Sequence, residues 1–198
     1  LGQFEFSNLF YDPNTVTGTV LTGLAGADTI TFTTGNTVVN AGDGANTITG
    51  TTGNKLITSG SGVDTIALTA GNHQIYAGAG ANTITATSGN SIVVTGGGAD
   101  TITFTSGNHW IDAGAGANTI VATSGINFVT TGDGADTSTL GDAPGGGGSY
   151  SPEVGGVYAG GNIIHAGHGA NTIVTGAGDD LVTGGDGVDT ITTGAGHD

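Results

Sequence analysis

The chain has 198 residues, 42 of them glycine, and a formal net charge of −15 with only one lysine or arginine. A polyanion of this kind cannot neutralise phosphates, so nucleic acid is excluded as a partner and binding to anionic membrane surfaces is disfavoured. The absence of cysteine excludes disulfides and thiolate metal sites, and no apolar run is long enough for insertion into a membrane. The charge instead favours a cation as the partner.

The first 22 residues do not repeat and are rich in large apolar side chains. Because the open end of a repeat protein must be covered, we predict that residues 1–22 form an N-terminal cap or linker. The side chains suited to this role are Phe4, Phe6, Leu9, Phe10 and Tyr11.

Residues 23–140 contain an 18-residue repeat, each copy with one Asp or Asn that usually follows Gly-x-Gly-x. Aliphatic residues recur every nine residues, as at Ile48 and Ile57. A short strand and a tight turn fit this spacing, and alternation along the strand points the aliphatic side chains inward. One coil cannot bury its own apolar face, so several must stack. The repeat predicts an all-β fold, a right-handed parallel β-roll (a β-solenoid) of 18-residue, two-strand coils.

A further inward column alternates between large and small side chains, which fills a narrow core without overpacking. Its members are Phe32, Gly50, Leu68, Ala86, Phe104, Ala122 and Leu140.

Residues 141–160 interrupt the repeat. Pro144, Pro152 and the run Gly145–Gly148 predict an irregular loop. The repeat resumes in residues 161–198, where an Asp or Asn falls every nine residues, so both edges of the roll should carry the acidic turn there. The sequence stops at Asp198 within a motif, and we expect a fragment of a longer protein.

The string Gly184–Thr192 resembles the nonapeptide of the RTX (repeats-in-toxin) calcium-binding β-roll family, and Thr175–Thr183 resembles it nearly as well. The resemblance covers about residues 23–139 and 160–198. It implies multiple bound calcium ions, export by type I secretion, and an extracellular or cell-surface location. It also implies repeats that lie outside any catalytic domain, so we expect no enzymatic activity.

Calcium takes six to eight oxygen ligands, and glycine-rich turns expose carbonyl groups. The resemblance implies that the turn carboxylates complete the shell. Asn offers only one oxygen acceptor, so alternation of Asp and Asn implies weaker sites or ions at only some coils. An Asp/Asn ladder without metal is the alternative, disfavoured because stacked carboxylates repel. The candidate ligands are Asp28, Asn46, Asp64, Asn82, Asp100, Asn118, Asp136, Asn171, Asp180, Asp189 and Asp198.

The outward positions beside these turns form columns of threonine. Threonine is a good strand former, but a nearly pure uncharged threonine face goes beyond that preference. The face resembles the Thr-x-Thr surfaces of β-solenoid antifreeze proteins, and the architecture resembles the ice-binding, adhesin type of RTX region. The candidate ice-binding residues are Thr29, Thr31, Thr33, Thr47, Thr49, Thr51, Thr65, Thr69, Thr83, Thr85, Thr87, Thr101, Thr103, Thr105, Thr119, Thr123, Thr137 and Thr139.

Three functions remain open. The first is ice binding, as an antifreeze or ice-adhesion module. The second is a structural or adhesive stalk or surface-layer module, and the third is a C-terminal secretion and folding module of a larger enzyme or toxin. Two smaller expectations concern individual side chains. His73 and His109 should be solvated surface residues, and Trp110 should pack with Val38, Ile92 and Phe128 on the other outward face.

Overall fold

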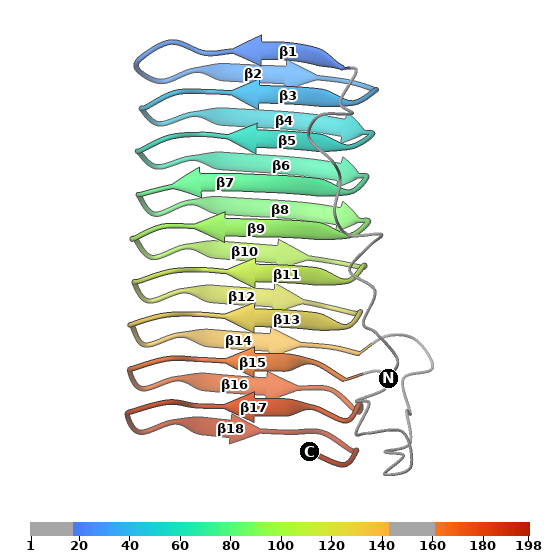
Figure 1. The fold of residues 1–198 in the computed structure, drawn as a ribbon, viewed down its shortest axis with the longest axis vertical. Helices are drawn as coiled ribbons and strands as arrows, with labels where there is room; N and C mark the ends of the chain where they lie inside the picture. Colours follow the sequence, from blue (N-terminus) through green and yellow to red (C-terminus); the bar gives the residue numbers. More distant parts are fainter. Residues whose placement is uncertain (1–17, 143–160) are drawn as a thin grey trace, which may run out of the picture.

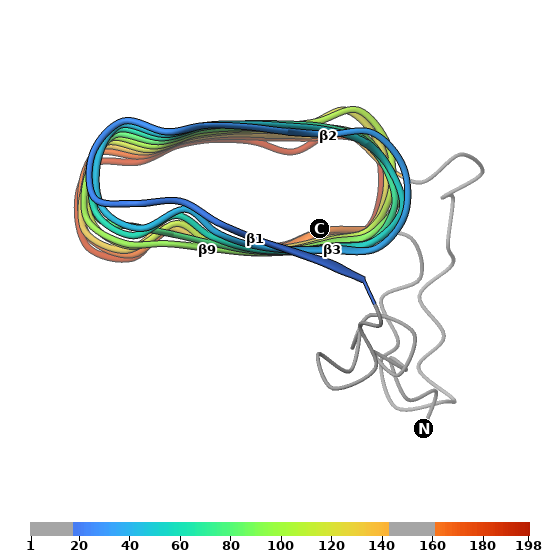
Figure 2. The same ribbon diagram turned by 90° about the horizontal axis from the view of Figure 1, so that it is seen from above.

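The computed structural model describes residues 18–142 and 161–198. These residues contain eighteen β-strands in two nine-stranded parallel sheets, and none of them lies in a helix. Each coil contributes one strand to each sheet, and successive coils stack into a right-handed solenoid (Figures 1 and 2). The predicted all-β solenoid is confirmed. No membrane-spanning helix is found in the part of the chain that the structure describes.

The odd-numbered strands form one sheet, here called the odd sheet. Its strands are β1 (Thr19–Thr22), β3 (Thr37–Asn40), β5 (Lys55–Thr58), β7 (His73–Gly78), β9 (Ser91–Thr95), β11 (His109–Asp112), β13 (Asn127–Thr130), β15 (Ile163–His165) and β17 (Leu181–Thr183). The even-numbered strands form the even sheet. Its strands are β2 (Thr29–Phe32), β4 (Thr47–Thr52), β6 (Thr65–Ala70), β8 (Thr83–Ser88), β10 (Thr101–Phe104), β12 (Thr119–Ala122), β14 (Thr137–Leu140), β16 (Thr172–Thr175) and β18 (Thr190–Thr192).

Neighbouring strands pair so that each residue lies beside the residue 18 positions later, as Thr29 beside Thr47. Across the interruption the offset is 35, as Phe128 beside Ile163 and Ser138 beside Ile173. The stack therefore continues past the interruption in register. The predicted cap lies largely, and the predicted loop almost wholly, outside the described residues, although β1 already pairs with β3 from Thr19.

The core is a narrow column of aliphatic side chains between the two sheets. Residues such as Ile48, Ile57 and Ile102 are fully buried. The alternation of large and small residues has a direct steric cause, because a Cβ atom on Gly50 would overlap the ring of Phe32 in the preceding coil. The ring of Phe32 thus uses the space that a side chain at Gly50 would otherwise fill.

Candidate metal centre

The turns from odd to even strands form one edge of the solenoid, here called the acidic edge. Nine residues that each precede an even strand form its ladder: Asp28, Asn46, Asp64, Asn82, Asp100, Asn118, Asp136, Asn171 and Asp189. The backbone N–H of each of the first eight donates to the Oδ1 of the ladder residue in the next coil. Asn82 N lies 2.7 Å from Asp100 Oδ1, and Asp100 N lies 3.0 Å from Asn118 Oδ1. The bond from Asp136 N to Asn171 Oδ1, 3.0 Å, carries the ladder across the interruption.

Glycine makes these turns possible. In the turn before Asp64, Gly60 and Gly62 have φ values of 81° and 133°, a region that other residues rarely adopt. A Cβ atom on Gly62 would also overlap the carbonyl of Gly44 in the coil before it. The result is a close stack of backbone carbonyl groups beside the ladder side chains.

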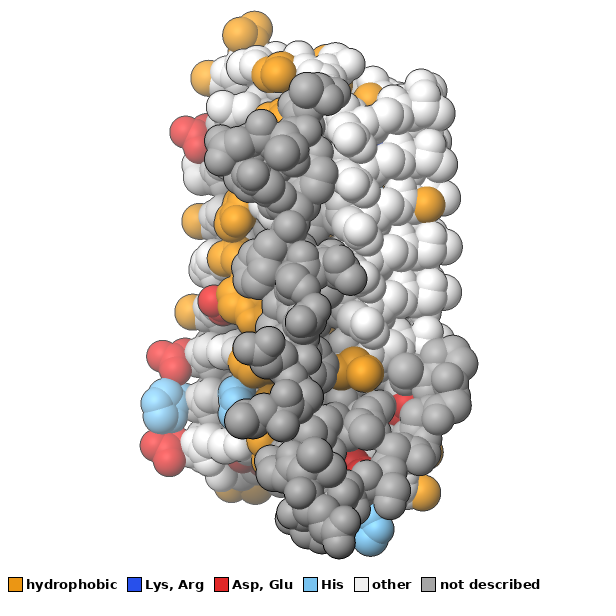
Figure 3. Space-filling model, turned by 45° about the vertical axis from the view of Figure 1, so that its right-hand side comes forward, with side chains coloured by type: hydrophobic (Ala, Val, Ile, Leu, Met, Phe, Trp, Pro, Cys, Tyr) orange, Lys and Arg blue, Asp and Glu red, His pale blue; other side chains and the backbone are white. Residues whose placement is uncertain are grey.

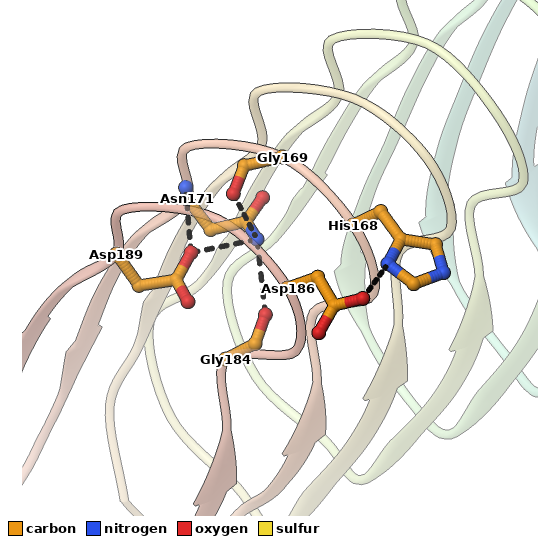
Figure 4. A network of polar contacts seen from close by, with 6 residues as sticks. All are labelled: His168, Gly169, Asn171, Gly184, Asp186 and Asp189. Carbon is orange, nitrogen blue, oxygen red and sulfur yellow. Dashed lines mark hydrogen bonds and ion pairs between the residues drawn. The ribbon is translucent and has the colours of Figure 1, made fainter.

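At the Asn positions the side-chain amide binds these carbonyls. Asn46 Nδ2 donates to Gly42 O at 3.0 Å, to Gly44 O at 3.1 Å and, in the next coil, to Ser59 O at 3.2 Å. Figure 4 shows the same arrangement at Asn171, whose amide reaches the carbonyls of Gly169 and Gly184 and the carboxylate of Asp189. The Asn turns are thus internally hydrogen-bonded.

At Asp64, Asp100 and Asp136 the equivalent atom is an oxygen without a donor in the described part of the chain, whereas the Oδ2 of Asp28 accepts a hydrogen bond from Leu24 N at 2.8 Å. Asp64, Asp100 and Asp136 are buried, and their Oδ2 atoms have no hydrogen-bond partner among the described residues. Burial raises the pKa of Asp100 and Asp136, although hydrogen bonds from backbone and side chains partly oppose the rise. A buried acceptor left without a donor is costly. A divalent cation would satisfy the carboxylate and the neighbouring carbonyls together.

The donor set fits calcium, which prefers hard oxygen ligands in a flexible arrangement. The described residues contain no group of three or more His, Cys, Asp or Glu side chains that could hold a metal. Each Asp turn brings one carboxylate to the ladder and each Asn turn brings none, so the glycine carbonyls would have to supply most of the ligands.

The turns from even to odd strands form the opposite edge, which becomes acidic only in the C-terminal coils. There Asn162, Asp180 and Asp198 form a ladder like that of the acidic edge, with Asn162 N 2.6 Å from Asp180 Oδ1 and Asp180 N 3.0 Å from Asp198 Oδ1. The Oδ2 atoms of Asp179 and Asp180 are buried and have no partner in residues 18–142 and 161–198. Asp180 and Asp198 therefore lie on the other edge from Asn171 and Asp189.

Asp142 also reaches this ladder, which the sequence did not indicate. Its Oδ1 accepts a hydrogen bond from Asn162 Nδ2 at 3.3 Å, and its Oδ2 accepts one from the N–H of Ala177. Burial raises the pKa of Asp142, and the negative charges of Asp180 and Asp198 raise it further. No periodic signal marks Asp142, whereas Asn162 could have been found 18 positions before Asp180.

In the N-terminal coils, the positions of the opposite edge that correspond to Asn162 and Asp180 carry no carboxylates. The space that these side chains occupy, where each turn meets an odd strand, is here called the corner. Its residues are Thr37, Lys55, His73, Ser91, His109 and Asn127, all buried. The expectation that His73 and His109 are solvated was wrong, since each is 2% exposed. They point into the corner as the Asp and Asn side chains do on the acidic edge.

The two histidines are neutral, because burial lowers the pKa of His73 to about 4 and that of His109 to about 3. The His109 ring stacks on Phe104 with 3.8 Å between ring centroids. Lys55 differs, because its Nζ donates to Gly35 O and to Thr52 O (2.7 Å) and lies 5.0 Å from the centroid of the Phe32 ring. An ammonium group thus binds turn carbonyls at this corner.

A second ladder of asparagines, which was not predicted, follows the surface of the opposite edge. Asn54 N donates to Asn36 Oδ1 at 3.1 Å, and Asn72 N donates to Asn54 Oδ1 at 2.9 Å. The pattern continues through Asn90 and Asn108. The Gly-Asn pair that recurs every 18 residues was the available signal.

The predicted threonine columns lie on the outer face of the even sheet. Thr85 and Thr103 are half-buried and the other candidates are exposed. Thr172, Thr190 and Thr192 extend the columns beyond the interruption. The column that begins at Thr33 lies within the strand in β4, β6 and β8 and just beyond the strand end in other coils. The outward positions of the described even strands carry no charged side chain.

The outer face of the odd sheet is different. Trp110 stacks on Phe128 with 6.4 Å between ring centroids, and Phe128 meets His165 edge-on at 5.7 Å. Figure 3 shows apolar side chains gathered along this sheet, whereas the edge beside it is almost free of apolar and charged side chains over its upper part. The expected packing of Trp110 with Phe128 is confirmed, and Ile92 lies beside Trp110 in the adjacent strand, whereas Val38 lies four strands away in the sheet.

Comparison with known families agrees with this geometry. The family model described as RTX calcium-binding nonapeptide repeat (4 copies) matches residues 20–39, 40–72, 76–108, 112–142 and 165–198, which together make up most of the chain. The comparisons with curated proteins and with solved structures returned no match. The chain therefore belongs to the RTX calcium-binding nonapeptide repeat family and is a calcium-binding β-solenoid.

Proposed function

We propose that calcium bound at the turns of this module holds the even sheet as a rigid threonine array that binds ice. The observation that carries the proposal is the set of exposed, uncharged threonine columns on in-register parallel strands. The calcium ligands in this proposal are the ladder carboxylates of both edges and the glycine carbonyls beside them.

The role of calcium follows from the buried oxygens. Without a cation, the Oδ2 atoms of Asp64, Asp100 and Asp136 lack a partner, and the carboxylates repel one another. Calcium would remove both costs and fix the spacing of successive coils. Extracellular calcium modules bind at about 10⁻⁴–10⁻³ M, which suits a chain that folds after type I secretion, in the extracellular space or at the cell surface.

The array has the regularity that an ordered water layer needs. Strand geometry places threonines about 6.7 Å apart along a strand and about 4.8 Å apart between coils. The β-branched side chain is stiff at χ1, so methyl and hydroxyl groups repeat with little disorder. The likeness to β-solenoid antifreeze surfaces supports ice as the ligand.

A structural or adhesive stalk is the second candidate. The aromatic pair Trp110 and Phe128 on the odd sheet favours it, because exposed apolar patches often mark contact surfaces. A secretion and folding module of a larger enzyme is the third, and a catalytic domain elsewhere in the full-length protein would favour it.

The test is ice-plane affinity of the calcium-loaded chain. We expect the wild type to bind a growing ice surface and the variant Thr83→Tyr/Thr85→Tyr to lose that binding with its circular dichroism unchanged. The matched control Asn40→Tyr/Thr58→Tyr places the same two rings on outward positions of the odd sheet and should retain binding. If ice binding survives the Thr83 and Thr85 changes, the even sheet is not the ice-binding surface. If the wild type has no affinity for ice, the ice-binding function is wrong and the structural or adhesive stalk becomes the first candidate.

A further inference from the structure

Three sequence features of the solenoid alternate together with a period of 36 residues, twice the 18-residue coil. The ladder residue alternates between Asp and Asn. Five positions before it, the turns of Asp64, Asp100 and Asp136 carry Ser59, Thr95 and Thr131, whereas the Asn turns carry Ala41, Ala77 and Ala113; the first Asp turn departs from this pattern with Gly23. Four positions after it, the Asp coils carry Phe32, Leu68, Phe104 and Leu140, whereas the Asn coils carry Gly50, Ala86 and Ala122. The structural unit is therefore a pair of unlike coils.

The Asn turn needs no ion. The amide of Asn82 donates to Gly78 O at 3.3 Å and to Gly80 O at 3.0 Å. The amide of Asn118 repeats these contacts with Gly114 and Gly116, at 3.2 and 3.0 Å. Each amide nitrogen thus binds glycine carbonyls of its own turn that could otherwise bind a cation.

The Asp turn is built differently. An ionised Asp has no proton to donate to the equivalent glycine carbonyls, and the Oδ2 atoms of Asp64, Asp100 and Asp136 are buried without a partner among the described residues. In these turns the hydroxyl of the Ser or Thr five positions before the Asp binds a carbonyl of the next coil, the contact that the Asn46 amide makes from its own turn with Ser59 O. Thr95 Oγ1 donates to Ala113 O at 2.7 Å, and Ser59 Oγ donates to Ala77 O at 3.1 Å. In these Asp turns the carboxylate Oδ2 remains as an acceptor without a donor within the described coils, while Oδ1 accepts the N–H of the preceding ladder residue.

We propose that calcium binds the acidic edge of the N-terminal coils only at every second coil, beside Asp64, Asp100 and Asp136. The amides of Asn46, Asn82 and Asn118 replace the ion in the coils between. This inference rests on the proposed function, in which the ladder carboxylates bind calcium, and adds the spacing of the bound ions. Successive ions would then lie two coils apart, about 9.6 Å rather than about 4.8 Å, which lowers the repulsion between them.

The proposal predicts opposite effects for two substitutions in the full chain. Asn82→Asp should add one bound calcium, measured by equilibrium dialysis, and should lower the melting temperature in EDTA because it removes an amide donor and adds a buried carboxylate. Asp100→Asn should remove one calcium and raise the melting temperature in EDTA, because the new amide can bind the carbonyls of Gly96 and Gly98.

Two outcomes separate this inference from the proposed ligands. If Asp100→Asn leaves the number of bound ions unchanged, the ladder carboxylates are not ligands and both proposals fail. If Asp100→Asn loses an ion but Asn82→Asp, folded in calcium by circular dichroism, gains none, only the alternation is wrong. If Asn82→Asp does not fold, the melting temperature of Asp100→Asn in EDTA tests the inference instead. A value above that of the wild type supports alternate binding, and a value below it would overturn the inference.

Discussion

The two edges of the solenoid differ in the side chains that occupy the space beside their turn carbonyls. On both edges one side chain per coil points into a corner lined by turn carbonyls. The acidic edge fills it with Asp or Asn, and calcium is the natural partner of the Asp carboxylates. Before residue 142 the opposite edge uses a lysine ammonium, two neutral histidines and small polar groups. The comparison teaches that the fold requires a filled corner, and that calcium is only one way to fill it.

The largest expected effect comes from removing calcium. The coils of residues 161–198 are acidic at both edges, whereas the coils before residue 142 have one edge that needs no ion. In EDTA, amides in β15 to β18 should therefore lose protection from hydrogen exchange before those in β5 to β13. Equal loss of protection in both regions, measured by mass spectrometry, would contradict the difference between the edges.

The next effect concerns the ammonium at the opposite edge. Lys55→Ala would remove the ammonium that binds the carbonyls of Gly35 and Thr52 and create a cavity beside Phe32, so we expect the free energy of unfolding in calcium to fall by about 3 kcal/mol. Urea unfolding measures it. The matched control is Ser91→Ala in the same column, whose hydroxyl has no partner within the described residues. An equally small effect for both variants would show that Lys55 is not a structural cation.

A smaller effect should appear on acidification. The folded-state pKa values of His73 and His109 lie below the ordinary 6.5, so their stabilising contribution is complete above pH 6.5 and is lost as the pH falls toward 4 and 3. The unfolded chain takes up these protons first, which costs at most about 1.4 kcal/mol per pH unit for each histidine.

His109→Phe should therefore show a shallower fall in melting temperature between pH 7 and pH 5 than the wild type. The control is His168→Gln, because His168 is an exposed residue 3.3 Å from Asp186 (Figure 4), and exposed pairs contribute little. Identical slopes for the His109 variant and the wild type would mean that the folded chain protonates His109 as readily as the unfolded chain does.

The smallest effect belongs to the outer asparagine ladder of the opposite edge. Asn54→Ala removes the oxygen that accepts a hydrogen bond from Asn72 N, and the expected loss is about 1 kcal/mol. Thermal unfolding in calcium measures it, with Thr58→Ala on the odd sheet as the control. If Asn54→Ala loses as much unfolding free energy as Lys55→Ala, the outer asparagine ladder stabilises this edge as much as the buried side chains do, which would contradict the account.

The fold could be predicted from the sequence because residues that are 18 positions apart lie beside each other in neighbouring coils. The columns of Ile48 and Ile57, the ladder of Asp28 to Asp136 and the outward threonines all follow from a spacing of 18. Prediction from the sequence failed at His73 and His109 because polarity suggested solvent, although both occupy the position nine residues after a ladder Asp, which points inward. The contact of Asp142 with Asn162 could not be predicted, because it depends on where the chain returns after the interruption.

The most direct measurement is anomalous diffraction from crystals grown in calcium. Calcium peaks should lie along the acidic edge, beside the unpaired carboxylate oxygens, and at the opposite edge only among the coils of residues 161–198. The absence of ions beside Asp64, Asp100 and Asp136, or ions along the corner of Lys55, His73 and His109, would contradict the account.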